Sequence, residues 1–524
     1  MSASSSIAHS RGAIATPHHL ATQAGQAALD SGGTAIDAAI AAATVLTVVY
    51  PHMSAIGGDV QALISLPGET PLAVNGSGAA ARSISAENLR REFKQMPTFG
   101  VHPISVPGMV SAWQALHQRA GRLPWKSLFT VAIGLARDGV GVAPALARDI
   151  SALTSRLIED DGIRSIFFHA DGKPLLEGER LVQPNLADTL QVISEQGAAA
   201  LYGGDVGRRL VDGLRQRGSA LTLGDFVNHK TTFSPVLALN FRGVDVLTAP
   251  PNTQGFVLLQ ILKALAAEGL NGEALGPDAA TLARLFALTA LDREERLADP
   301  RYATVDTDTL LSDGYIEGLR AVARDRSKQL QLLPLMSRPD GDTVAISAMD
   351  SSGHSISLIQ SIFFAFGSGV LESDTGILCH NRGAAFSLDP RKPSYIVGGR
   401  RPPSTLTPCL LANDEGVFAA VGTMGGKSQP QILAQHLVRF LAGQNAQACL
   451  DQPRWVVGAF GAEGAEVVLV ESSVPSESRE ILAGAGLPLV VGKFHDDRAG
   501  HSQIVHRSKN GFVAATDPRG DGAI

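Results

Sequence analysis

The chain has 524 residues, of which 44% are hydrophobic and 18% are charged, the balance of a folded globular protein and not of a disordered one. Its formal net charge is −6, so it lacks the basic excess that binding to nucleic-acid phosphates requires. The longest strongly apolar run, near 38–50, is shorter than the roughly 20 residues of a membrane-spanning helix, and residues 1–11 hold no apolar core of signal-peptide length. We therefore expect a cytoplasmic protein with no nucleic-acid or membrane partner.

Two adjacent helices are predicted near the N-terminus. The first covers 20–29, where apolar residues recur at helical spacing, and it stops at the glycine pair 32–33. Thr34 begins the second, and Asp37 stands three residues later, as in a capping box. Because this second helix is apolar on most of its faces, we expect it to be buried.

Further along, two short strands are predicted at 62–66 and 71–75, on either side of a Pro-Gly turn. From about residue 110 to 325 the chain is predicted to be mostly helical, with no internal repeat. The segments with helical apolar spacing in this middle part are 110–119, 128–138, 186–196, 207–217 and 281–296.

The pattern changes abruptly at residue 343. A charged and polar segment, 324–341, is followed directly by strand-like alternation at 343–349, a turn, and a second alternating run at 354–361. A flexible, cleavable segment that leads straight into a β-hairpin is an unusual junction. It is therefore the most informative place in the sequence.

Several common functional motifs do not occur in the sequence. It contains no H-E-x-x-H, H-x-H or G-x-S-x-G pattern, and the glycine-rich run 422–428 has Val421 where a phosphate-binding loop needs glycine. The backbone N–H groups of such a run have a second use, because they can be directed at an oxyanion. Cys379, Cys409 and Cys449 form no C-x-x-C pair, so we expect them to be small buried side chains. No metal and no cofactor are expected.

Thr343 has two interpretations. It is either an ordinary first residue of a strand or an N-terminal nucleophile that a break after Asp342 would create. A free α-amine has a pKa near 8, so at neutral pH a useful fraction of it is able to act as the base for its own hydroxyl. Nucleophile and base would then belong to one residue, and no histidine would be needed.

Motif-bearing stretches occur in five groups along the chain: Pro17-His-His-Leu-Ala-Thr-Gln-Ala-Gly25 with Gly32-Gly-Thr-Ala-Ile-Asp-Ala-Ala39; Tyr50-Pro-His-Met-Ser-Ala-Ile-Gly-Gly-Asp59; Gly341-Asp-Thr343 with Phe366-Gly-Ser-Gly369; Arg401-Pro-Pro-Ser-Thr-Leu-Thr-Pro408 with Gly422-Thr-Met-Gly-Gly426; and Gly500-His-Ser-Gln-Ile-Val505 with Asp517-Pro-Arg-Gly-Asp-Gly-Ala523. In content and order they resemble the gamma-glutamyltransferase family of N-terminal-nucleophile hydrolases. This resemblance implies an α+β fold, a four-layer αββα sandwich. It also implies autocleavage at Asp342/Thr343 into a large subunit, 1–342, and a small subunit, 343–524, which together form one domain.

The resemblance also implies roles for individual residues. Thr343 matches the family's nucleophile, and Ser361 stands where the family usually has a second Thr whose hydroxyl bonds to that nucleophile. A polar strand residue without such a role is the alternative for Ser361. Gly425 and Gly426 match the glycines of the oxyanion hole, whose N–H groups would stabilise the charge that develops when the nucleophile attacks a carbonyl.

The substrate-binding positions are matched only in part. Ser404 and Thr405 match the Ser pair that binds the substrate's α-carboxylate, but Phe363, Arg382 and Ala385 stand where the family has Asn, Gln and Asp. These three residues form no credible site for an amine. Arg382 would repel an ammonium and favour a carboxylate, unless it is held in a structural ion pair.

Two stretches, 358–362 and 381–390, resemble the oxamate amidohydrolase branch of the family. This implies hydrolysis of a small, carboxylate-bearing amide through an acyl-threonine intermediate. The loop between 386 and 404 looks short beside the lid of the transpeptidases, which favours water as the acceptor. Three alternatives stay open: a gamma-glutamyl hydrolase or transferase, an acylase for larger amides, and an uncleaved, non-catalytic relative that binds a small acid. The expected partners are the substrate, water and the two fragments; association of two fragment pairs is left open.

Overall fold

The computed structural model describes residues 8–267, 272–330, 332, 341–460 and 466–522. The segment predicted to be cleavable, 324–341, is therefore covered only in part, because 331 and 333–340 lie outside the described residues. The same holds for 1–7 at the N-terminus and for the last residue of the final motif, at position 523.

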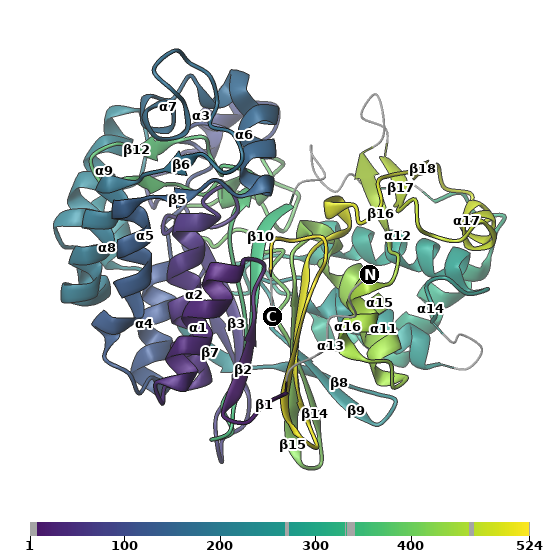
Figure 1. Ribbon diagram of the computed structural model, residues 1–524. Coiled ribbons are helices and arrows are strands. Elements are labelled where there is room, and N and C mark those ends of the chain that lie inside the picture. Colours follow the sequence, from purple (N-terminus) through teal and green to yellow (C-terminus); the bar gives the residue numbers. More distant parts are fainter. Residues whose placement is uncertain (1–7, 268–271, 331, 333–340, 461–465, 523–524) are drawn as a thin grey trace.

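Two antiparallel sheets form the centre of the molecule (Figure 1). In order across the first sheet the strands are β1 (Ala8–His9), β20 (Gly511–Thr516), β19 (Ser502–Ser508), β15 (Gly416–Thr423), β14 (Cys409–Asn413), β9 (Val244–Thr248) and β8 (Leu237–Phe241). In order across the second they are β2 (Gly12–Ala15), β10 (Gly341–Asp350), β11 (Ser355–Phe364), β3 (Asp59–Ser65), β4 (Leu72–Asn75) and β7 (Thr232–Pro235).

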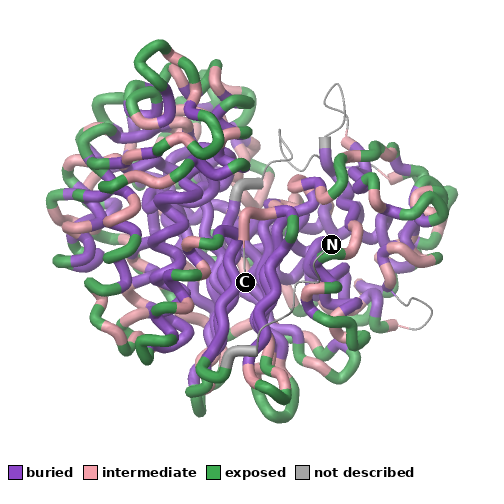
Figure 2. The backbone as a smooth tube through the Cα atoms, viewed as in Figure 1, coloured by how far each residue is buried: buried purple, intermediate pink, exposed green. Residues whose placement is uncertain are grey.

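The two sheets pack face to face, with β10 and β11 of one against β15 of the other. The contact is so close at Gly422 that a Cβ there would lie 2.8 Å from Ile359 Cδ1 and 3.1 Å from the Cβ of Ala345. A glycine is therefore needed for this approach. Figure 2 shows the strands of both sheets as a continuous buried region in the middle of the molecule.

Helices from the first half of the chain cover the six-stranded sheet (Figure 1). They include α1 (His19–Asp30), α2 (Ala35–Val49), α4 (Met109–Ala120), α5 (Thr130–Asp138) and α8 (Pro184–Gln196). Every residue of α2 is buried, as predicted, and α2 contacts β2, β10 and β11. The predicted capping box is present, because the Thr34 side chain accepts from the Asp37 N–H and the Asp37 side chain accepts from the Thr34 N–H.

A second group of helices lies on the other side, where α11 (Gly255–Ala266) contacts β8 and β9, and α15 (Gln429–Leu441) contacts β15. The remaining helices are α3 (Ala86–Glu92), α6 (Pro144–Leu157), α7 (Asp161–Phe167), α9 (Asp205–Gln216), α10 (Leu223–Val227), α12 (Ala279–Arg296), α13 (Thr307–Leu310), α14 (Asp313–Arg324), α16 (Ala446–Asp451) and α17 (Ser476–Ala483). Two small sheets have two strands each: β5 (Val140–Gly141) with β6 (Arg180–Leu181), and β12 (Leu371–Glu372) with β13 (Ile377–Leu378). A third has β17 (Glu466–Val470) between β16 (Trp455–Phe460) and β18 (Leu489–Val491).

The predicted α+β class is confirmed, and so are the helices, the paired strands and the hairpin after residue 343, each within a few residues. All three cysteines are buried, as predicted. The expectation of a mostly helical middle was incomplete, because β7, β8 and β9 lie within it. These strands have only four or five residues each, and a run that short gives weak periodicity beside the long helices around it.

The two predicted subunits are interleaved in both sheets. The seven-stranded sheet takes β1, β8 and β9 from before the 342–343 bond, and the six-stranded sheet takes β11 and all of β10 except Gly341 and Asp342 from after it. A break of that bond would therefore leave each sheet intact, held by ladder hydrogen bonds between the fragments. Within the described residues, no helix is both long and apolar enough to cross a membrane.

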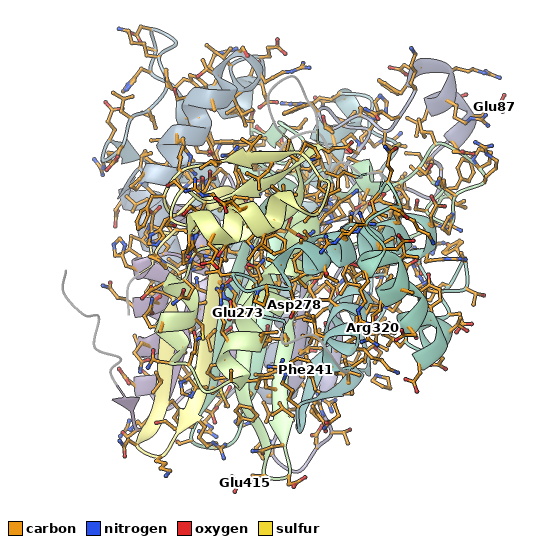
Figure 3. The ribbon with its side chains drawn as sticks, turned by 90° about the vertical axis from the view of Figure 1, so that its right-hand side faces the viewer. Glu87, Phe241, Glu273, Asp278, Arg320 and Glu415 are labelled. Atoms are coloured by element: carbon orange, nitrogen blue, oxygen red, sulfur yellow. The ribbon has the colours of Figure 1, made fainter. Side chains whose placement is uncertain are left out.

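The glycine-rich loop 422–426 lies at one end of the central sheets. Figure 3 shows Glu415 at the tip of the turn between β14 and β15, at the bottom of the molecule. Because β15 runs from Gly416 to Thr423, the glycine loop begins at the opposite end of this strand. That end of the molecule holds the candidate site.

Candidate active site

The predicted nucleophile and its partner face each other across two neighbouring strands. Thr343 on β10 is paired in register with Ser361 on β11, and Thr343 Oγ1 donates a hydrogen bond of 3.1 Å to Ser361 Oγ. Both side chains are almost fully buried, with 2% and 0% of their surfaces exposed. The structure thus brings together a hydroxyl pair that the sequence separates by 18 residues.

The backbone is irregular on both strands at this point. The β10–β11 register shifts between Asp342 and Thr343, and Phe363 has a φ of +83°, in the left-handed region that bulky residues rarely adopt. The Ser361 hydroxyl supports this geometry, because its oxygen accepts a 2.8 Å hydrogen bond from the Phe363 N–H. Local backbone strain of this kind is typical of functional sites.

The loop with the predicted oxyanion glycines lies next to β10, which contacts the 3₁₀ turn Gly426–Ser428. Gly425 and Gly426 have φ values of +130° and +52°, which favour glycine. The Gly425 carbonyl accepts from the Ser428 N–H at 2.8 Å, and the Met424 carbonyl accepts from Thr423 Oγ1 at 2.8 Å. In a planar trans peptide the N–H points opposite to the carbonyl, so the N–H groups of Gly425 and Gly426 point away from these two bonds.

A buried ionic network is connected to this glycine loop by hydrogen bonds. Asp517 accepts from Arg454 at 2.5 Å and from Arg519 at 3.0 Å, with all three side chains fully buried. Asp517 also accepts from the Ser502 N–H at 3.0 Å, and Ser502 Oγ donates at 2.8 Å to Oγ1 of Thr423, two residues before Gly425. Although burial opposes ionisation, Arg454 and Arg519 hold the pKa of Asp517 well below its usual range.

Gln254, at the start of α11, connects the glycine loop to the segment that carries Ser404 and Thr405. Its fully buried amide nitrogen donates to the Gly426 carbonyl at 3.0 Å and to the Thr405 carbonyl at 2.7 Å. One side chain therefore fixes the two segments relative to each other.

Arg382 is held in a buried ion pair. Its guanidinium contacts both carboxylate oxygens of Asp59, at 3.0 and 2.9 Å, with both side chains fully buried. The remaining arm, Nη1, donates to Thr405 Oγ1 at 3.2 Å, and the Phe363 ring lies 4.4 Å from Cζ. The structure thus contains the ion pair that was one of the two interpretations of this residue; its role as a substrate ligand stays a prediction.

A small pocket of about 40 Å³ lies beside these groups. The residues that line it are Arg293, Glu294, Leu297, Phe363, Ala385, Ser394, Pro403, Ser404, Thr405 and Lys427. A larger outer pocket of about 550 Å³ adjoins this small inner pocket. The two pockets share one wall, which consists of Glu294, Ala385, Ser394 and Lys427. Ser404 and Thr405 line the inner pocket, and their role in substrate binding stays a prediction. Arg382 does not line it but contacts the Thr405 hydroxyl.

Three charged residues line the small inner pocket: Arg293, Glu294 and Lys427, of which the last two also line the outer pocket. Lys427 Nζ lies 2.5 Å from Glu294 Oε1, and Arg293 Nη2 lies 3.0 Å from the same oxygen. Burial lowers the pKa of Lys427 to about 8, with Glu294 opposing the shift and Arg293 adding to it. Burial alone would raise the pKa of Glu294, but Lys427 and Arg293 hold it at about 2.

Sequence reasoning missed four residues of the site: Gln254, Arg293, Glu294 and Lys427. Lys427 directly follows the two glycines and could have been found from that position. Gln254 stands in a polar run, 252–254, between a strand and an apolar helix, which was a weak signal. Arg293 and Glu294 lie near the end of an amphipathic helix, where charged residues are ordinary, so no local pattern marks them. The side chain of Asp342 lies outside the described residues.

The chain is similar to known proteins along nearly its whole length. The chain is 34% identical over 521 residues to the glutathione hydrolase-like YwrD proenzyme of Bacillus subtilis, covering 97% of each chain. It is 34% identical to the oxamate amidohydrolase proenzyme of Klebsiella pneumoniae over 99% of each chain. The crystal structure of cephalosporin acylase from Bacillus halodurans superposes with a TM-score of 0.89 at 31% identity, over 100% of this chain and 97% of the acylase. A sequence profile of the family described as gamma-glutamyltranspeptidase matches residues 21–524, and the chain belongs to this family.

Proposed function

We propose that the protein is a self-processing amidohydrolase that is cut between Asp342 and Thr343. The two similar proteins at 34% identity are both named as proenzymes, which supports a processed form. The interleaved strands support a stable pair of fragments, 1–342 and 343–524, in one domain. The two packed sheets, with helices on their outer faces, support the four-layer αββα sandwich.

Cleavage supplies the base for the reaction. In the unprocessed chain the nitrogen of Thr343 belongs to a peptide bond and is not basic. After cleavage it becomes an α-amine with an ordinary pKa near 8, next to its own hydroxyl. As Oγ1 attacks the substrate's amide carbonyl, the proton that it donates to Ser361 Oγ before the reaction passes to the amine instead.

Negative charge on the attacked oxygen is stabilised by the N–H groups of Gly425 and Gly426. The carbonyl hydrogen bonds of Met424 and Gly425 fix both peptides before any substrate binds. Donors held in this way need no rearrangement during the reaction, and removing one such donor typically costs about 100- to 1,000-fold in kcat.

The intermediate collapses when the amine returns its proton to the leaving nitrogen and the C–N bond breaks. Ammonia or an amine departs, and the acyl group remains bound to Thr343 as an ester. Water then attacks this ester, with the α-amine again accepting the proton, and releases the acid. Each turnover therefore consumes one water and produces one acid and one amine.

The acyl group that suits the inner pocket is small and carries a carboxylate. Ser404 and Thr405 supply hydroxyls at this end, and Arg382 orients the Thr405 hydroxyl while remaining the predicted ligand for an acidic group. A volume of about 40 Å³ favours a short acyl chain such as that of oxamate. A gamma-glutamyl amine is disfavoured, because the Phe363 ring and Ala385 offer it no acceptor.

The observation that carries this proposal is the Thr343–Ser361 hydrogen bond, on strands that lie next to the glycine loop and lead to Phe363 in the wall of the small pocket. The test is a substrate panel on the processed protein, with oxamate first and a gamma-glutamyl anilide as the competitor class. We expect acid release from oxamate or another short acidic amide and no release of aniline. Turnover of the anilide with none of the acidic amides would contradict the proposal.

A second function, acylase activity on larger amides, is favoured by one observation. The outer pocket of about 550 Å³ adjoins the inner one and would accept a longer acyl chain. Amides of medium-chain diacids belong in the same panel, and a higher kcat/KM for them than for oxamate would favour this function.

A further inference from the structure

The wall of the inner pocket carries an unbalanced charge within the described part of the chain. Arg293 and Lys427 bring two positive charges, and Glu294 brings one negative charge. Arg382 adds nothing to this balance, because Asp59 neutralises it behind the pocket. A buried charge without a counterion is unfavourable, so the wall is suited to receive one more anion.

Both cations retain donors for such an anion. An ammonium has three N–H groups, and Glu294 uses one of those on Lys427. Arg293 is 3% exposed, and its Nη2 makes no hydrogen bond within the described part of the chain, although Glu294 lies 3.0 Å away. Arg293 Nη1 donates to the Lys427 carbonyl at 3.0 Å, which joins the two residues into one unit.

This unit lies next to the predicted reaction centre. Lys427 directly follows Gly426, and consecutive Cα atoms are about 3.8 Å apart. Its side chain lines the inner pocket together with Ser404 and Thr405. One short substrate would therefore place its carbonyl oxygen at the glycine N–H groups and its carboxylate at the Lys427 ammonium.

We propose that Lys427 determines substrate specificity, and that its ammonium, together with Arg293, binds the carboxylate of a short acyl group. This inference rests on the proposed function, because it names the residue that selects the acid. The pKa of about 8 is consistent with this role. Lys427 is mostly protonated at neutral pH, and its pKa lies below that of an exposed lysine because its burial disfavours the charge, which a bound carboxylate would stabilise. The carboxylate would restore the charge balance that Glu294 alone leaves incomplete.

The test compares oxamate with oxamide, its neutral analogue of nearly the same shape, in processed wild-type and variant proteins. Lys427→Met removes the charge, and Lys427→Arg keeps it. Lys263→Met is the matched control, because Lys263 also pairs with an acidic residue, Asp313 at 2.7 Å, but lines neither pocket. Intact mass after incubation establishes first that each variant is processed.

We expect Lys427→Met to lower the ratio of kcat/KM for oxamate over oxamide by about 10- to 100-fold, mainly through KM. Lys427→Arg should stay within about threefold of wild type, and Lys263→Met should not change the ratio. A processed Lys427→Met enzyme with an unchanged ratio would overturn this inference and leave the proposed function standing. A wild-type enzyme that hydrolyses oxamide but not oxamate would overturn both.

If Lys427→Met is not processed, Glu294→Gln carries the test. Glu294 also raises the pKa of Lys427, so this variant is assayed at mildly acidic pH, where the ammonium stays protonated. Removing the anion that competes for the Lys427 ammonium should then raise the preference for oxamate by about threefold or more. An unchanged or lower preference in this variant would overturn the inference.

Discussion

Thr343 Oγ1 and Ser361 Oγ lie 3.1 Å apart on neighbouring strands of a sheet that both predicted fragments build. Ser361 also accepts from the Phe363 N–H, so one hydroxyl contacts both the predicted nucleophile and the strained backbone beside it. The position of the Thr343 hydroxyl and the local backbone geometry are therefore coupled through a single oxygen.

Replacing Ser361 with Ala should slow both self-processing and turnover. The change removes the acceptor of two buried hydrogen bonds, and we expect a loss of about tenfold in kcat. Ser361→Thr keeps the hydroxyl and should remain within about threefold of wild type. Fragment formation followed over time, together with steady-state kinetics, measures both effects. A Ser361→Ala protein that processes and turns over at the wild-type rate would make Ser361 a simple strand residue.

Replacing Arg382 with Ala should destabilise the protein by about 3–5 kcal/mol, because Asp59 would keep a buried charge without its partner. The Thr405 hydroxyl would also lose its donor, so KM for acidic amides should rise. Thermal unfolding and kinetics measure the two consequences. The matched double variant Asp59→Asn with Arg382→Met should be less destabilised than the sum of its single variants. Unchanged KM and kcat for every acidic amide would contradict the assignment of this residue to the pocket.

Replacing Asp517 with Asn should cost about 3–5 kcal/mol, since Arg454 and Arg519 would both lose a buried counterion. Through Ser502 and Thr423 the change also reaches the glycine loop, so kcat should fall as well. Asp188→Asn is the control, because its ion pair with Arg137 is exposed and contributes about 0–1 kcal/mol. Equal melting temperatures for the two variants would contradict a role for the buried network.

Stability should fall as the pH drops from 7 to 5. His52 is fully buried, and burial together with Arg148 lowers its pKa well below 6.5, although an Asp149 oxygen lies 3.7 Å from Nε2. Burial also lowers the pKa of His501. Below pH 6.5 the unfolded chain therefore binds more protons than the folded one, and each such histidine removes up to about 1.4 kcal/mol per pH unit.

The measurement for this pH effect is the melting temperature of wild type and His52→Gln between pH 7 and 5. Carboxylates with lowered pKa values, such as Asp517, lose their contribution only at more acidic pH, so they do not obscure this window. The variant should show a shallower decline than wild type. An equally steep decline would show that His52 does not titrate with unfolding.

The elements with strong periodicity were predictable from the sequence, and the contacts between distant segments were not. The Thr34 capping box and the hairpin after Thr343 depend on neighbouring residues, so local patterns reveal them. The wall of the pocket joins Arg293 and Glu294 of α12 to Lys427 of the glycine loop, 133 residues away in the case of the Lys427–Glu294 bond. Only the packing of the two sheets and their helices brings these charges together.

Arg382 illustrates the same limit of sequence reasoning. A resemblance could place it at a substrate position, but it could not reveal that Asp59, 323 residues earlier in the chain, neutralises it. A guanidinium shows its partner only when the fold is known, because the bidentate geometry with a carboxylate is a tertiary contact.

The central claim is that Thr343 becomes an N-terminal nucleophile, and intact mass spectrometry of the purified protein after incubation at neutral pH tests it most directly. We predict two masses, for fragments 1–342 and 343–524, in the wild type, and one full-length mass without amidase activity in Thr343→Ala. A wild-type chain that stays at a single full-length mass for days would contradict the account, because Thr343 would then have no amine to act as its base.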